Sequence, residues 1–134
     1  MDLLKIPDSD DLLLKELTDD IIKSYYKVYN TLGYGFLEQV YQNALYFELL
    51  KKHQCRPQAE IDVFYEGQVV GKYRADIIVD DKVILELKAA EEISEAHATQ
   101  LLNYLKATKM EVGLLLNFGK IPEIKRKVFE NKYK

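Results

Sequence analysis

The sequence predicts an α/β protein, a mixed sheet flanked by helices, and three observations lead to that prediction. Apolar residues at helical spacing come first along the chain. Strand-like apolar runs separated by turn residues follow in the middle. A further helical stretch then precedes VGLLLNF at 112–118, an uninterrupted apolar run typical of a strand buried on both faces. The expected order is α-α-β-β-β-α-β.

The N-terminal part is expected to be an arm over 1–17, with a short helical turn at 12–17, followed by the first helix. Thr18 is a candidate N-cap because two aspartates follow it in the first turn, where acidic side chains favour the helix dipole. Apolar spacing continues to Leu32, where LGYG ends the helix. A second helix is expected over 36–53.

Three strands and a crossover are expected in the rest of the chain. Pro57 opens the strand region, and turn signals divide it into an antiparallel meander over 57–65, 69–79 and 83–89. Ser94 is a candidate cap for a helix that ends near 109. Because that helix connects the third strand to the fourth, the fourth strand should run parallel to the third.

Composition limits the classes of protein that remain. A chain of 134 residues is expected to be one domain, 1–134, with an ordinary core. The single cysteine, Cys55, excludes an internal disulfide and a multi-cysteine metal site. The sequence has no signal-peptide pattern and no apolar run of membrane-spanning length, so we expect a cytoplasmic protein without membrane contact.

Charge is distributed unevenly along the chain, whose net charge is −3. Residues 1–20 hold seven acids and two lysines, whereas 120–134 hold six bases and two glutamates. We describe 120–134 as a basic C-terminal tail, open between helix and strand. A basic tail suits phosphate contacts, and it equally suits a solvated face.

Charged residues interrupt the two strands of the hairpin RADIIVDDKVILELKAAEE at 74–92: Asp76, Glu86 and Lys88. Side chains alternate along a strand, so Glu86 and Lys88 share a face. A three-residue loop at 80–82 places Asp76 opposite Glu86, and also pairs Ile78 with Ile84 and Arg74 with Lys88. A two-residue loop would place Asp76 opposite Leu85 instead.

Hydrophobicity favours the three-residue loop. That register gathers one apolar face and leaves the charges on the other; the apolar face comprises Ala75, Ile77, Val79, Val83, Leu85 and Leu87. Two facing carboxylates repel each other. A hard divalent cation, which takes anionic oxygen ligands, would stabilise the pair. The alternative is a solvated, charged sheet face.

Two further elements extend the pattern. GFLEQVY at 35–41 places Glu38 in the first turn of the second helix, with Tyr41 on the same face. QLLNY at 100–104 places Gln100 and Tyr104 on one face of the third helix. Each element alone also suits an ordinary helix.

Together the three elements resemble the GxxExxY proteins of the PD-(D/E)XK nuclease superfamily, over roughly residues 18–119. Gly35, Glu38 and Tyr41 match the name of the group. Asp76 with Glu86-Leu87-Lys88 matches the D…ExK signature, although Ala75 replaces the proline before the aspartate. Gln100 to Tyr104 matches the QxxxY helix of the RecB-like members. The resemblance implies a restriction-endonuclease-like α-β-β-β-α-β core.

The resemblance also implies roles for these residues. Asp76, Glu86 and the main-chain carbonyl of Leu87 would bind Mg²⁺ or Mn²⁺, with Glu38 as a further acidic ligand. Lys88 would position the attacking water and stabilise charge on the phosphate. Substrate-binding residues would be Gln100, Tyr104 and Tyr41.

The function that follows is a metal-dependent nuclease that hydrolyses phosphodiester bonds with metal-activated water. The alternatives are a nucleic-acid-binding module that does not cut, and a protein-interaction module with the same fold. Expected partners are nucleic acid, with DNA favoured over RNA, a second copy of the chain in a homodimer, and a helicase or repair protein.

Overall fold

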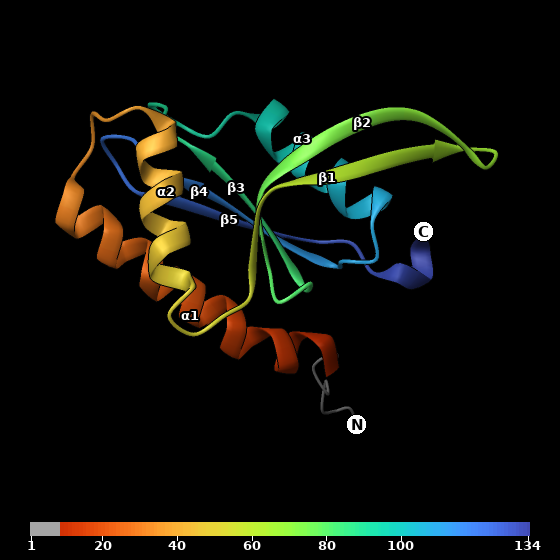
Figure 1. Cartoon of the computed structure of the whole chain (residues 1–134), viewed down its shortest axis with the longest axis horizontal. Helices are drawn as coiled ribbons and strands as arrows, with labels where there is room; N and C mark the ends of the chain where they lie inside the picture. The colour runs from red at the N-terminus through yellow and green to blue at the C-terminus, as the bar shows by residue number, and fades with distance from the viewer. Residues whose placement is uncertain (1–8) are drawn as a thin grey trace, which may run out of the picture.

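The computed structural model describes residues 9–134, and Figure 1 shows their arrangement. The elements, in chain order, are α1 (Ser9–Leu32), α2 (Glu38–Leu49), β1 (Cys55–Tyr65), β2 (Gln68–Val79), β3 (Val83–Lys88), α3 (Glu95–Ala107), β4 (Val112–Asn117), β5 (Glu123–Val128) and a 3-10 turn at Asn131–Tyr133. No helix of the described part is long and apolar enough to cross a membrane.

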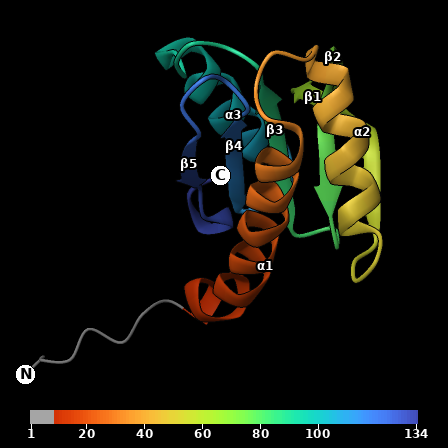
Figure 2. The ribbon, with the colours of Figure 1, turned by 90° about the vertical axis from the view of Figure 1, so that its left-hand side faces the viewer.

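The five strands form one mixed sheet in the order β1-β2-β3-β4-β5. β3 pairs with β4 in parallel, and the other neighbours are antiparallel. The predicted meander and the parallel crossover through α3 are therefore confirmed. Helices α1 and α2 lie on one face of the sheet and α3 on the other, as the two views show (Figures 1 and 2).

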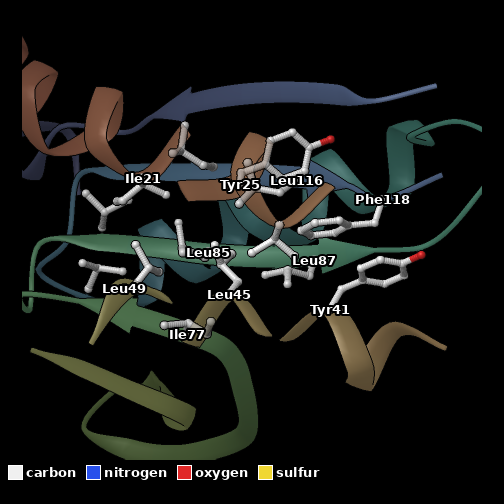
Figure 3. Packing of buried hydrophobic residues seen from close by; sticks show 14 of the residues in the cluster. Ile21, Tyr25, Tyr41, Leu45, Leu49, Ile77, Leu85, Leu87, Leu116 and Phe118 are labelled. Atoms are coloured by element: carbon white, nitrogen blue, oxygen red, sulfur yellow. The ribbon is translucent and has the colours of Figure 1, made fainter. Parts of the chain in front are cut away.

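Both faces of the sheet are buried, each by its own apolar cluster. The α1/α2 side packs large side chains against alternate residues of the central strands, among them Ile21, Tyr25, Tyr41, Leu85 and Leu116 (Figure 3). On the α3 side, Leu101 and Leu105 pack against Ile78, Ile84 and Leu115. This double burial explains the apolar run at 112–118, since both sets of alternating side chains in β4 meet a helix.

The N-terminal prediction is wrong in two respects. Thr18 does not cap a helix but lies inside α1, where its hydroxyl donates to the carbonyl of Lys15 at 3.1 Å. Helix α1 already begins at Ser9, so residues 9–17 are not an arm; 1–8 lie outside the described residues. The helix continues because the buried stripe of Ile21 and Tyr25 extends back to Leu14.

The C-terminal tail, which the sequence left open between helix and strand, contains a strand. Residues 123–128 form the edge strand β5, which pairs antiparallel with all of β4. Ile124 packs on the α1/α2-side cluster, while Lys125, Arg126 and Lys127 supply the charge. Basic side chains on an edge strand discourage pairing with another sheet, which gives the charge of this segment a structural reason.

Strands β1 and β2 extend beyond the sheet as a two-stranded arm, seen at the right of Figure 1. β2 pairs with β1 along 68–79 but with β3 only along 77–79. Ala75 therefore leaves the apolar face predicted for it and packs in the α3-side cluster with Ala59. The physical reason is that β2 separates from β3 before this residue is reached.

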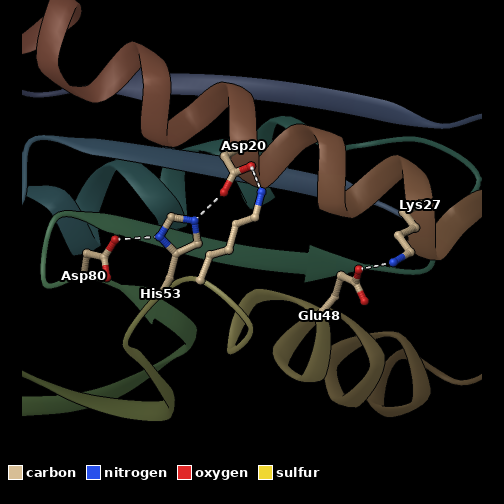
Figure 4. A network of polar contacts seen from close by, with 6 residues as sticks. Asp20, Lys27, Glu48, His53 and Asp80 are labelled. Atoms are coloured by element: carbon tan, nitrogen blue, oxygen red, sulfur yellow. Dashed lines mark hydrogen bonds and ion pairs between the residues drawn. The ribbon is translucent and has the colours of Figure 1, made fainter.

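A polar cluster fastens three elements together near the loop between β2 and β3. His53 contacts Asp20 of α1 through Nε2 at 2.5 Å and Asp80 of the loop through Nδ1 at 2.8 Å (Figure 4). Lys27 and Glu48 join α1 to α2 at 2.5 Å. These contacts fix both helices relative to the hairpin that carries the predicted acids.

Candidate metal and catalytic site

The hairpin has the predicted register, and its ladder ends where the acids begin. Ile77 pairs with Leu85, Ile78 with Ile84 and Val79 with Val83, so the loop is 80–82. Beyond Ile77 the main-chain N–H of Asp76 donates to Glu86 Oε1 at 3.0 Å. The N–H of Leu87 donates to Asp76 Oδ2 at 2.7 Å. The two carboxylates thus occupy positions that a continued ladder would give to main-chain carbonyls.

Burial of these acids is costly because few charges compensate them. Glu86 is only 4% exposed, and burial, followed by the charge of Asp76, raises its pKa to about 8. Burial also raises the pKa of Asp76, although the N–H of Leu87 and the charge of Lys88 oppose the rise. The pair places two acids side by side where the fold alone does not require them.

Glu38 reaches the same place from the start of α2. It is the first residue of the helix, and the main chain of Ala89, directly after β3, acts to lower the pKa of its carboxylate. Partial desolvation raises its pKa; Lys88 lowers it and Asp76 raises it further. Three acids and one lysine from α2, β2 and β3 therefore share one electrostatic environment.

Tyr41 was predicted to bind substrate, but it does not line the site. It is completely buried and stacks on Phe118 at a ring distance of 4.5 Å. Its hydroxyl donates to the carbonyl of Gly33 at 2.6 Å and accepts the N–H of Phe36 at 3.1 Å. Gly35 between them has a φ of +112°, which side chains disfavour. The Gly-x-x-Glu-x-x-Tyr spacing thus fixes the loop that delivers Glu38.

Lys88 closes β3 and is half-buried beside the acids. Its ammonium charge lowers the pKa of Glu38, Asp76 and Glu86 alike, so it lies within reach of all three. Burial lowers the pKa of His97, and the charge of Lys88 lowers it further. A single cation in this position can hold an anionic group against the acids.

Gln100 and Tyr104 bring α3 to the site. Gln100 Nε2 donates to the Tyr104 hydroxyl at 2.5 Å. Burial raises the pKa of Tyr104, and the charges of Glu86 and Asp76 raise it further, which places the hydroxyl near the acids. The predicted face of this helix therefore meets the predicted hairpin. Ser94 caps α3 as predicted, through a reciprocal pair of hydrogen bonds with His97.

Two glutamines that the motifs did not indicate, one from α2 and one from β1, support the position of Asp76. Gln42 of α2 is buried and donates to the carbonyl of Asp76 at 3.2 Å. Gln58 of β1 donates to Gln42 Oε1 at 3.0 Å, and its side-chain amide acts to lower the pKa of the Asp76 carboxylate. Gln58 has a φ of +48°, a conformation that a glutamine adopts only where its surroundings enforce it. No spacing in the sequence indicates this contact.

Asn117 is another residue without a sequence signal. Its side chain is fully buried, accepts the N–H of Ala90 at 3.0 Å and donates to the carbonyl of Ala90 at 2.9 Å. The N–H of Phe118 donates to the carbonyl of Lys88 at 2.7 Å, and Tyr25 donates to the carbonyl of Asn117. The end of β4 therefore fixes the chain directly after Lys88.

The donor set suits a hard divalent cation in its chemistry. Carboxylate oxygens from Glu38, Asp76 and Glu86 are the ligands that Mg²⁺ and Mn²⁺ prefer, and three acids exceed the single charge of Lys88. Among the side chains that the structure describes, no three Asp, Glu, His or Cys residues form a ready-made cage. A cation would therefore have to compete with the N–H donors that now occupy Asp76 and Glu86.

Comparisons with known proteins identify the superfamily and the fold. A family model for the PD-(D/E)XK nuclease superfamily matches residues 15–128. A solved structure titled "Crystal structure of SSO0001" superposes with a TM-score of 0.55 at 18% identity, over 89% of this chain and 61% of that one. The chain thus spans less than two thirds of that structure, and the likeness concerns the fold alone. A search of curated proteins found no match.

Proposed function

The chain belongs to the PD-(D/E)XK nuclease superfamily, and from that premise we propose that it is a nuclease that uses Mg²⁺ or Mn²⁺ to hydrolyse nucleic-acid phosphodiester bonds. Its restriction-endonuclease-like mixed sheet is that of the superfamily. We further propose that it belongs to the GxxExxY group, on the spacing of Gly35, Glu38 and Tyr41.

One observation carries the proposal. Asp76 and Glu86 take each other's strand N–H groups at the point where β2 parts from β3, in place of ordinary ladder bonds. A sheet built for stability alone would continue its ladder with apolar side chains here. Burying two acids side by side raises the free energy of the fold, and such a cost is typical of functional sites.

The residues divide the work as follows. Asp76, Glu86, the carbonyl of Leu87 and Glu38 would hold the metal ion, which when bound acidifies water and neutralises charge on phosphate. Lys88 would orient the attacking water and hold the scissile phosphate by its charge. Gln100 and Tyr104, joined by their hydrogen bond, would offer donors to the substrate backbone. Gln42 would hold the main chain of Asp76 through its carbonyl, and Gln58 would hold Gln42 in turn.

The test is a nuclease assay on single-stranded and duplex DNA and RNA, with Mg²⁺, Mn²⁺ or EDTA. We expect metal-dependent cleavage by the wild type and none by Asp76→Ala or Glu86→Ala. Lys88→Ala should lose at least about 100-fold in rate, as expected when a group that stabilises transition-state charge is removed, yet keep its affinity for the metal in calorimetry. The matched control is Lys82→Ala, an exposed lysine in the loop of the same hairpin.

Two results would contradict the proposal. If the wild type cuts no substrate with either metal but binds nucleic acid as well as Glu86→Ala does, the chain is a binding module. If it neither binds nucleic acid nor responds to divalent metal, it is a protein-interaction module. We propose DNA as the favoured substrate. We also propose that the chain forms a homodimer and acts with a helicase or repair protein. The free thiol of Cys55 suits a cytoplasmic location.

A further inference from the structure

A large groove lies between the β1–β2 arm and helix α3. Its volume is about 910 Å³, at the upper end of the range for ligand sites. The arm contributes Val63, Phe64 and Tyr73, and α3 contributes Gln100, Asn103 and Tyr104. We call this the arm groove. Adjacent residues Val63 and Phe64 both line it because the strand register shifts between them.

The arm groove presents aromatic side chains that no core requires. Phe64 is 61% exposed and Tyr73 is 50% exposed. The Tyr73 ring lies 5.6 Å from that of Tyr104, which closes the inner end. Side-chain amides of Gln100 and Asn103 lie along the same wall. Flat apolar faces with amide groups beside them are suited to unpaired nucleobases, which have a π-face for stacking and polar edges.

The groove is continuous with the candidate site. Tyr104 lines the groove, and its hydroxyl also lies close enough to Glu86 and Asp76 for their charges to raise its pKa. Gln100, which lines the groove too, is hydrogen-bonded to that hydroxyl. A nucleic-acid strand whose bases lie in the groove would therefore have its phosphate backbone near Asp76 and Glu86.

The lining of the groove favours base faces over phosphates, and therefore a single strand over a duplex. Its charged lining consists of Glu95 and Lys106, which cancel. A duplex turns phosphates outward and hides its base faces, so it would meet apolar rings where it needs cations. We propose that the arm groove binds the unpaired bases of single-stranded nucleic acid and delivers that strand to the carboxylates. This inference rests on the proposed function for its direction, but binding in the groove is testable without cleavage.

The experiment is fluorescence anisotropy with the full chain in EDTA, which prevents cleavage. The probes are an oligonucleotide of about 12 nucleotides, an abasic strand of equal length and a matching duplex. We expect the single strand to bind best and the abasic strand poorly. Phe64→Leu and Tyr73→Leu should each weaken binding of the single strand roughly 5- to 100-fold, the range for loss of one base stack.

The control is Phe47→Leu, because Phe47 is an exposed aromatic residue on α2, outside the arm groove. It should bind like the wild type, and thermal melts should show all three variants folded. The inference is overturned if the abasic strand binds equally well, if the duplex binds better, or if the arm variants match Phe47→Leu. It is also overturned if sedimentation shows that the wild type is a dimer and that Phe64→Leu is a monomer, since a second copy would then cover the groove.

The two proposals fail separately. If the wild type cuts nucleic acid with metal while Phe64→Leu and Tyr73→Leu change neither affinity nor rate, the groove inference fails and the nuclease proposal stands. If those variants lose single-strand binding but the wild type never cuts, the nuclease proposal fails and the groove stands.

Discussion

The main-chain N–H of Asp76 donates to the carboxylate of Glu86 at 3.0 Å, at the place where the ladder between β2 and β3 ends. The return contact, from the N–H of Leu87 to Asp76 Oδ2, measures 2.7 Å. Each acid is thus satisfied by the strand opposite. Glu86 is buried and Asp76 partly buried, and within the described part of the chain no basic side chain is hydrogen-bonded to either carboxylate. This arrangement determines how the protein should respond to pH and substitution.

Removing the buried charge of Glu86 should stabilise the metal-free protein. Burial and Asp76 raise the folded-state pKa to about 8, above its ordinary value of 4.5. The folded state therefore binds this proton more tightly, and the related stability is full below pH 4.5 and lost as the pH rises through 8. Glu86→Gln avoids that loss and keeps an oxygen for the N–H of Asp76.

Urea unfolding in EDTA at pH 5 and pH 8 measures the effect. We expect Glu86→Gln to be more stable than the wild type by roughly 1–3 kcal/mol at pH 8, and the gap to shrink at pH 5. A variant that is less stable than the wild type at pH 8 would show that Glu86 belongs to an ordinary stabilising network.

Much of the site could be predicted because it depends on alternation along strands. The parity of apolar residues in β2 and β3 predicted the loop at 80–82 and the approach of Asp76 to Glu86, which are hydrogen-bonded. Helical spacing likewise placed Gln100 beside Tyr104. Local patterns fail where a longer one overrides them: Thr18 has the chemistry of a cap, but the buried stripe from Leu14 carries the helix through it.

Contacts made by the tertiary structure left no local pattern. Gln58 precedes a buried alanine in β1, so the sequence indicates an ordinary strand residue. Its φ is +48°, however, and its side chain contacts Gln42, which holds the carbonyl of Asp76. Asn117 reads as the polar end of an apolar strand, yet it holds Ala90 from both sides. Ala75 follows the alternation but not the sheet, because β2 has already left β3.

Gln58→Gly should separate stability from metal binding. A non-glycine residue in the left-handed region costs about 1–2 kcal/mol, and glycine removes that cost while freeing the unfolded chain. The variant should therefore melt at the wild-type temperature or slightly above. Its affinity for Mn²⁺ in calorimetry should fall several-fold, because Gln42 loses the Gln58 amide that holds it against Asp76, and the Asp76 carboxylate loses the amide that lowers its pKa.

The matched control is Glu66→Gly, which has the same backbone conformation, a φ of +49°, at the exposed turn of the arm. It should change stability in the same direction and leave Mn²⁺ affinity unchanged. If both variants bind Mn²⁺ like the wild type, Gln58 has no part in positioning Asp76.

Tyr41→Phe tests the loop that delivers Glu38. The ring can keep its stacking on Phe118, but the hydroxyl contacts with Gly33 and Phe36 are lost. We expect destabilisation of about 1–2 kcal/mol in urea unfolding and faster hydrogen exchange at the Phe36 amide. Tyr34→Phe, an exposed tyrosine of the same loop, should change neither. Unchanged exchange at Phe36 in Tyr41→Phe would show that the loop is held by other contacts.

His53, which contacts the loop of the same hairpin, should also make stability depend on pH. Partial burial lowers its pKa, but the hydrogen bonds to Asp20 and Asp80 and their charges outweigh burial, so the folded-state pKa is raised above 6.5. A raised histidine pKa contributes stability that is complete below the unfolded value and fades as the pH rises through the folded one.

His53→Gln should therefore cost more at pH 6 than at pH 9, about 1–2 kcal/mol at the lower pH, since it breaks two ion pairs that join α1 to the β2–β3 loop. Urea unfolding at both pH values measures this. Lys52→Gln is the control, because Lys52 is exposed and only reaches Asp20 at 3.9 Å, so it should cost less than about 0.5 kcal/mol at either pH. An equal loss for His53→Gln at pH 6 and pH 9 would mean that the imidazole acts through packing and neutral hydrogen bonds, because a charged pair must weaken as the ring loses its proton.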